Sequence, residues 1–151
     1  MQSRRETLKQ SAVVAGLLAS TGMFAGQALA YTKDAFEAKT IAEALKALGA
    51  GAPTASKDVT ITAPDIAENG AVVPFTVTTT LAAVKSLLIL VEKNPNALAA
   101  KFDVTDAVLP SFATRVKMGQ SSDVYAVAIT ADGKALFAKT DVKVTIGGCG
   151  G

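Results

Sequence analysis

The chain has 151 residues, 15 of them Lys or Arg and 13 Asp or Glu, with one cysteine and no histidine. Without an imidazole, a Cys-His dyad, a Ser-His-Asp triad and histidine-ligated zinc, copper or haem are excluded. A single cysteine likewise excludes an internal disulfide, an iron–sulfur cluster and a CxxC redox pair.

Residues 1–30 have the composition of a cleavable export signal. Arg4 and Arg5 form a charged start, followed by a stretch of almost wholly apolar or small residues. Ala28 and Ala30 then make a small-x-small cleavage site. The paired arginines predict the twin-arginine pathway and therefore a periplasmic protein. The alternative, a transmembrane anchor, needs about 20 apolar residues, and polar residues interrupt this run too early.

Removal of the signal takes three of the 15 basic and one of the 13 acidic side chains, which leaves 12 of each. A mature chain without net charge gives no reason to expect nucleic acid or an anionic membrane as a partner. The remaining length suits one domain with a real core, which we assign to residues 31–146.

The first predicted element is an amphipathic helix over residues 35–48. Asp34 and Glu37 resemble a capping box, and apolar residues follow at helical spacing up to Leu48. Gly49 is a natural C-cap, which ends the helix.

From Val59 onward, apolar residues recur with the period of two that is typical of strands. The run from Leu87 to Val91 is apolar throughout and suits a strand covered on both faces. Asp132-Gly133 predicts a hairpin. The remaining strands are expected around residues 59–63, 73–78, 102–104, 112–118, 125–129, 135–138 and 142–146.

Seven or eight short strands with regular turn signals predict a mainly β fold: an immunoglobulin-like antiparallel β-sandwich of about seven strands with one N-terminal helix. A small β-barrel is the alternative.

The chain ends in Gly147-Gly148-Cys149-Gly150-Gly151. Glycines on both sides leave the backbone permissive and let the sulfur enter a narrow space, so residues 147–151 are interpreted as a flexible arm. An odd thiol in an oxidising compartment is either paired to another chain or kept reactive. A buried structural role is the alternative, but a chain end offers little core.

No other group of residues predicts a catalytic or metal site. Asp103 with Asp106, and Asp65 with Glu68, are candidate carboxylate pairs, but aspartate at such positions usually serves turns. Without a base in the chain, most of the Cys149 thiol is protonated at neutral pH. Such a thiol is better suited to insertion into another protein's active site than to catalysis, which favours a carrier over an enzyme.

The leader, the small β-rich domain and the terminal Gly-Gly-Cys-Gly-Gly together resemble the SoxY family of bacterial thiosulfate oxidation. The segment from Ile66 to Pro74 is similar to the family's second-strand region.

The resemblance implies a SoxZ-like partner subunit in a heterodimer and Cys149 as the covalent attachment site for sulfur intermediates, with no cofactor and no metal. It also implies transient docking to a haem enzyme that couples thiosulfate to the thiol, to a thiosulfohydrolase and to a sulfane dehydrogenase. Disulfide-linked oligomers through Cys149 are a further expectation.

Two other functions fit parts of the sequence. A ubiquitin-like sulfur carrier also ends in Gly-Gly, but its adenylation needs cytoplasmic ATP, whereas this chain carries an export signal. An exported structural sandwich that crosslinks two copies through Cys149 is the second alternative.

Overall fold

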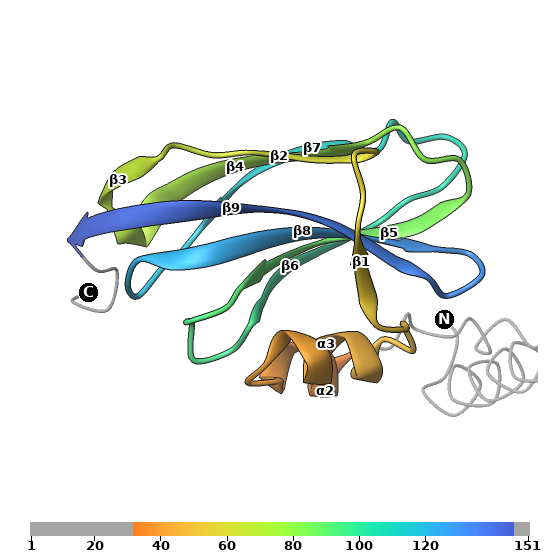
Figure 1. Ribbon diagram of the computed structural model, residues 1–151, viewed down its shortest axis with the longest axis horizontal. Helices are drawn as coiled ribbons and strands as arrows, with labels where there is room; N and C mark the ends of the chain where they lie inside the picture. The colour runs from red at the N-terminus through yellow and green to blue at the C-terminus, as the bar shows by residue number, and fades with distance from the viewer. Residues whose placement is uncertain (1–31, 147–151) are drawn as a thin grey trace, which may run out of the picture. The chain divides into compact units, whose positions relative to one another are not determined.

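The computed structural model describes residues 32–146. Within them, nine strands form two sheets, and two short helices lie against the outer face of the larger sheet (Figure 1). The predicted leader, residues 1–30, and the predicted arm, residues 147–151, lie outside the described residues.

The larger sheet has the order β1 (Pro53–Ala55), β9 (Ala135–Ile146), β8 (Ser122–Thr130), β5 (Val84–Val91) and β6 (Leu98–Asp103), and β3 (Ile66–Asn69) also pairs with β9. The smaller sheet has the order β2 (Val59–Thr62), β4 (Val73–Thr79) and β7 (Ser111–Val116). The predicted immunoglobulin-like sandwich is thereby confirmed. The antiparallel arrangement holds except for β1 and β3, which run parallel to β9.

β5 organises the core because both of its faces are buried from Leu87 to Val91, as the apolar run in its sequence predicts. Leu87, Ile89 and Val91 belong to the cluster between the two sheets. Leu88 and Leu90 point the opposite way and pack in a second cluster beneath the helices. All five side chains are fully buried. The sandwich therefore has a third, helical layer that shares a strand with the main core.

The helical region consists of α2 (Lys33–Glu37) and α3 (Ile41–Ala47) instead of one helix over residues 35–48. Ala38 has an extended conformation, with ψ of 134°, and ends α2. Thr40 then starts α3 with a capping box: its hydroxyl accepts from the Glu43 N–H, and the Glu43 carboxylate accepts from the Thr40 N–H, both at 3.2 Å. The capping box is therefore not the predicted pair that starts at Asp34.

Two glycines occupy turns that require a positive φ. Gly49 follows the C-cap of α3 with φ of 71°, and Gly133 lies in the β8–β9 hairpin with φ of 83°. The N–H of Gly51 donates to the Gly133 carbonyl at 3.0 Å, so the chain after α3 runs alongside the hairpin. The hairpin prediction is confirmed, and Gly49 lies at the end of the helical region as predicted, one position after the C-cap residue Leu48.

Candidate functional site

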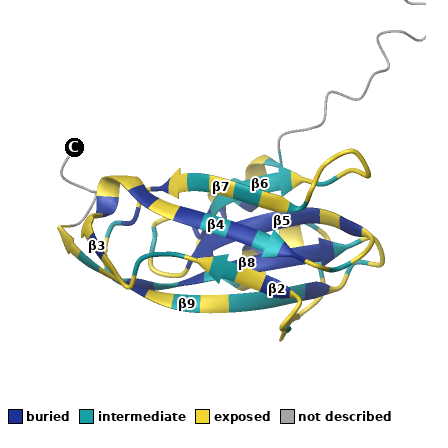
Figure 2. Ribbon diagram, turned by 90° about the horizontal axis from the view of Figure 1, so that it is seen from above, coloured by how far each residue is buried: buried dark blue, intermediate teal, exposed yellow. Residues whose placement is uncertain are grey.

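β9 carries the chain toward the predicted attachment site. Val142 is fully buried, Val144 is half-buried, and the last described residue, Ile146, is 69 % exposed. Figure 2 shows β9 alternating between more and less covered positions and ending in exposed ones. The packed core therefore ends before the strand does.

The exposed end of β9 is held by hydrogen bonds from two sides. On one side, parallel pairing with β3 places Asn69 beside Ile146, and the Thr145 hydroxyl donates to the Glu68 carbonyl at 2.9 Å. On the other side, the Val144 N–H donates to the Ser121 hydroxyl at 2.9 Å. These bonds keep β9 in place up to its last described residue, although its side chains there are exposed.

The residues that would carry the chemistry come directly after β9 in the chain. Cys149 and its glycines, Gly147, Gly148, Gly150 and Gly151, lie outside the described residues, as do Arg4, Arg5, Ala28 and Ala30 of the predicted signal and cleavage site. Because an extended chain advances about 3.3 to 3.6 Å per residue, the Cα of Cys149 lies within about 11 Å of that of Ile146. Any group that reacts with the thiol must therefore approach this end of the domain.

The described residues do not assemble a set of metal ligands. Between residues 32 and 146, no three His, Cys, Asp or Glu side chains come together as metal ligands would. No helix of that part of the chain is long and apolar enough to span a membrane.

The two candidate carboxylate pairs have ordinary surroundings. Asp103 forms an ion pair with Lys101 of the same strand. Asp65 and Glu68 are exposed, and their main-chain carbonyls accept hydrogen bonds from Lys143 and Thr145 of β9. Asp65 and Glu68 thus contribute to the site through main-chain carbonyls that help to hold the end of β9.

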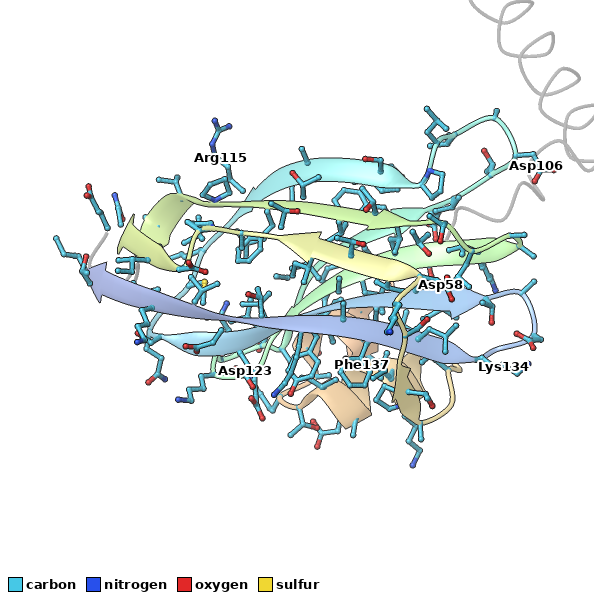
Figure 3. The ribbon with its side chains drawn as sticks, turned by 45° about the horizontal axis from the view of Figure 1, so that its top comes forward. Asp58, Asp106, Arg115, Asp123, Lys134 and Phe137 are labelled. Carbon is cyan, nitrogen blue, oxygen red and sulfur yellow. The ribbon has the colours of Figure 1, made fainter. Side chains whose placement is uncertain are left out.

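Sequence reasoning missed a basic hollow near this end of the sandwich. Arg115 and Lys117 alternate with buried residues of β7 and the loop that follows it, and both line an open hollow of about 370 Å³ beside the start of β6. Figure 3 shows Arg115 projecting away from the sheets in the half of the molecule where β9 ends. The alternation of these two basic residues with apolar ones is visible in the sequence. The hollow itself cannot be recognised there, because it depends on how the two sheets are placed in space.

The domain resembles a solved structure in both sequence and fold. The sulfur carrier protein SoxY from Chlorobium limicola f thiosulfatophilum is 35 % identical, with a TM-score of 0.56, over 62 % of this chain and 84 % of that one. A variant of superoxide reductase (neelaredoxin) from Ignicoccus hospitalis shares only the fold, at 12 % identity and a TM-score of 0.51 over 57 % of this chain and 78 % of that one. No curated protein matches the chain.

The family comparison covers most of the domain and reaches the terminal motif. Residues 44–149 match the model of the family described as sulfur oxidation protein SoxY. The match begins in α3, spans both sheets and ends at the unique cysteine. The chain therefore belongs to the SoxY family, as the resemblance in its sequence predicts.

Proposed function

We propose that this protein is the covalent sulfur carrier of a periplasmic thiosulfate oxidation system, with the Cys149 thiol as the attachment point. The observation that carries the proposal is that the family match extends to residue 149, so the only thiol in the chain falls inside the matched segment. The exposed, hydrogen-bonded end of β9 supplies a fixed base three residues before that thiol.

The chemistry assigned to Cys149 consists of two steps performed by partner enzymes. In the first, the thiol and thiosulfate lose two electrons and one proton to a haem enzyme, and an S–S bond joins Cys149 to a thiosulfonate group. In the second, water attacks the terminal sulfur, so that sulfate and a proton leave and a persulfide stays on the cysteine. A sulfane dehydrogenase would oxidise that remaining sulfur. The domain supplies position, and the enzymes supply the redox and hydrolytic groups.

Glycines 147, 148, 150 and 151 serve this scheme as a flexible carrier arm. A residue without Cβ leaves space around the sulfur and tolerates the backbone conformations that a narrow enzyme channel imposes. The rest of the chain need not enter the channel. Replacing these glycines with alanine would therefore lower turnover without preventing the thiol from being modified in free solution.

Export and partnership complete the proposal. The Arg4-Arg5 leader would direct the folded chain through the twin-arginine pathway, with cleavage after Ala30. If the domain binds no cofactor, as the proposal holds, it gains from this pathway when a leaderless SoxZ-like subunit is exported with it as a heterodimer. A tagged mature chain purified from the periplasm should then carry a stoichiometric partner, and its isolation alone would contradict co-export.

The central test compares wild-type protein with Cys149→Ser. Intact mass of wild-type protein isolated without reductant should show sulfur adducts on Cys149 that a thiol reductant removes. The variant should bind its partner normally and lose thiosulfate-dependent sulfate formation. Loss of disulfide dimers with sulfur oxidation intact would instead support a crosslinking sandwich. A thiocarboxylate on Gly151 would support the ubiquitin-like alternative.

A further inference from the structure

The two sheets separate along one side of the sandwich. β6 pairs only with β5, and β7 only with β4, so within the described residues both present a free edge on that side. At one end of this side, Phe102 of β6 and Phe112 of β7 stack with ring centroids 4.5 Å apart and close the gap. Toward the other end, the hollow of about 370 Å³ opens between the Asn94–Asn96 loop and β7.

The hollow has a cationic rim. Arg115 and Lys117, both exposed, stand at the rim, and the buried residues Leu98 and Val116 also border the hollow. No carboxylate lines the hollow, and neither cation forms an ion pair with a described residue. A guanidinium fork beside an ammonium is a suitable arrangement for a sulfonate, whose oxygens accept charge-assisted hydrogen bonds.

The backbone of Lys117 is held in place by hydrogen bonds around it. Asn94 bridges the loop after β7: its amide nitrogen donates to the Lys117 carbonyl at 2.7 Å, and its amide oxygen accepts from the Gly119 N–H at 3.1 Å. The intervening residue, Met118, is fully buried, and its N–H donates to the Gly70 carbonyl at 2.7 Å. Lys117 therefore projects from a fixed backbone, on a long flexible stem.

The end of β9 lies within reach of this rim. Ile146 is paired with Asn69, the neighbour of Gly70, and Gly70 is bonded to Met118. With strands about 4.8 Å apart and successive Cα atoms 3.8 Å apart, this path places the Cα of Lys117 within about 18 Å of that of Ile146. Three extended residues cover about 10 Å of that span, and the cysteine adduct together with the lysine stem covers the rest.

We propose that the anionic adduct on Cys149 docks at Lys117 and Arg115 of the same chain when no enzyme holds it. The proposal rests on the proposed carrier function and adds a resting position for the loaded arm. A thiosulfonate carries a fixed negative charge, whereas the free thiol at neutral pH does not. The loaded arm is therefore drawn to the rim by that charge, and the unloaded arm is not.

The test uses the mature chain with chemically defined groups on Cys149. Tetrathionate converts the thiol into the thiosulfonate and releases thiosulfate. Iodoacetate adds an anionic carboxymethyl group, and iodoacetamide adds a neutral group of similar size. NMR spectra should show shifts at the Lys117 and Arg115 side chains with both anionic groups and none with the neutral one. The shifts should fade toward about 1 M salt, where the Debye length is about 3 Å.

Two double variants separate docking from general charge effects. Arg115→Gln with Lys117→Gln should abolish the adduct-dependent shifts throughout the hollow. Lys57→Gln with Lys85→Gln removes two exposed lysines, outside the hollow, that form no ion pair with a described residue, and should leave those shifts unchanged. Equal spectra for the anionic and neutral adducts would overturn the docking proposal. Mass spectrometry of the same samples reports whether the thiol accepts the thiosulfonate, so the carrier function is judged separately.

Discussion

Among the described residues, Asp132 in the β8–β9 hairpin has a strongly shifted acidity. A hydrogen bond from Lys134, at 2.7 Å, and a second from the Thr130 hydroxyl lower the pKa of its carboxyl from 3.8 to about 2. The same contact raises the pKa of Lys134. These contacts are exposed to water at the hairpin tip, so the contribution of the ion pair to stability is small and sensitive to salt.

The acid dependence of this contact follows from the direction of the shift. Because folding lowers the Asp132 pKa, its contribution to stability is complete above pH 4 and is lost as the pH falls toward 2. Asp132→Asn should therefore unfold at a slightly lower temperature than wild type at pH 6, and the difference should vanish near pH 2. Thermal unfolding at both values measures this. If the unfolding temperatures of wild type and variant differed by the same amount at pH 2 and pH 6, the effect would come from the turn conformation and not from the charge of Asp132.

A second residue-scale prediction contrasts two leucines. Leu88 of β5 is fully buried beneath the helices, whereas Leu109 in the loop before β7 is 84 % exposed. Leu88→Ala should lower the free energy of unfolding by about 2 to 5 kcal/mol, because it removes packed methyl groups and leaves a cavity. Leu109→Ala should change it by less than about 0.5 kcal/mol. Urea unfolding of the two variants gives both values, and similar losses would contradict the assignment of Leu88 to the core.

At the scale of elements, the end of β9 depends on side-chain as well as main-chain bonds. The Ser121 hydroxyl accepts from the Val144 N–H at 2.9 Å. Ser121→Ala leaves that donor without its partner and should cost about 1 kcal/mol. Hydrogen exchange at Val144 should become faster, while exchange in the middle of β5 should change only by the global loss of stability. Ser111→Ala, at an exposed position of β7, is the matched control.

An unchanged exchange rate at Val144 in Ser121→Ala would show that pairing with β3 alone holds this end of the strand. The distinction matters for the carrier proposal, since a frayed β9 would lengthen the arm by several residues. Each released residue would add about 3.3 to 3.6 Å of reach. The position from which Cys149 is presented would then be less well defined.

The elements that the sequence predicts well are those with a strong local signal. β5 contains the apolar run from Leu87 to Val91, and Gly133 fixes the β8–β9 hairpin, so both are recognisable without knowledge of their neighbours. β1 is exposed throughout, and β3 buries only Ala67. Neither shows an alternating pattern, because each is held by parallel pairing with β9, which lies far along the chain.

The sequence predicts the helical region but not its division into two helices, for a related reason. Apolar spacing continues across residues 38–40, so periodicity alone joins α2 to α3. The break follows from the chain packing on the sheet, where the Ala38 carbonyl accepts from the Ala97 N–H at 2.9 Å. In the candidate site, the glycine neighbours single out the unique cysteine, and its role stays a prediction. The hollow at Arg115 and Lys117 was not recognisable, because it depends on tertiary spacing.

At the scale of the whole molecule, one strand joins the two cores. β5 gives alternate side chains to the cluster between the sheets and to the cluster beneath the helices. Neither cluster can lose its packing without exposing one face of the same backbone. The helical layer and the sandwich should therefore unfold together, as small single domains usually do.

This cooperativity can be tested with one substitution in each cluster. Leu45→Ala weakens the helical layer, and Phe75→Ala weakens the contact between sheets; both side chains are at least 99 % buried. We expect losses of about 2 to 5 and 3 to 5 kcal/mol, respectively. In each variant, far-ultraviolet circular dichroism and tyrosine fluorescence should report one coincident transition, because Tyr125 packs against the helix-side cluster while most strands lie elsewhere. If Leu45→Ala instead produced an early fluorescence change with the sheet signal intact, the helices would be a separately melting layer, and the carrier domain would consist of the sandwich alone.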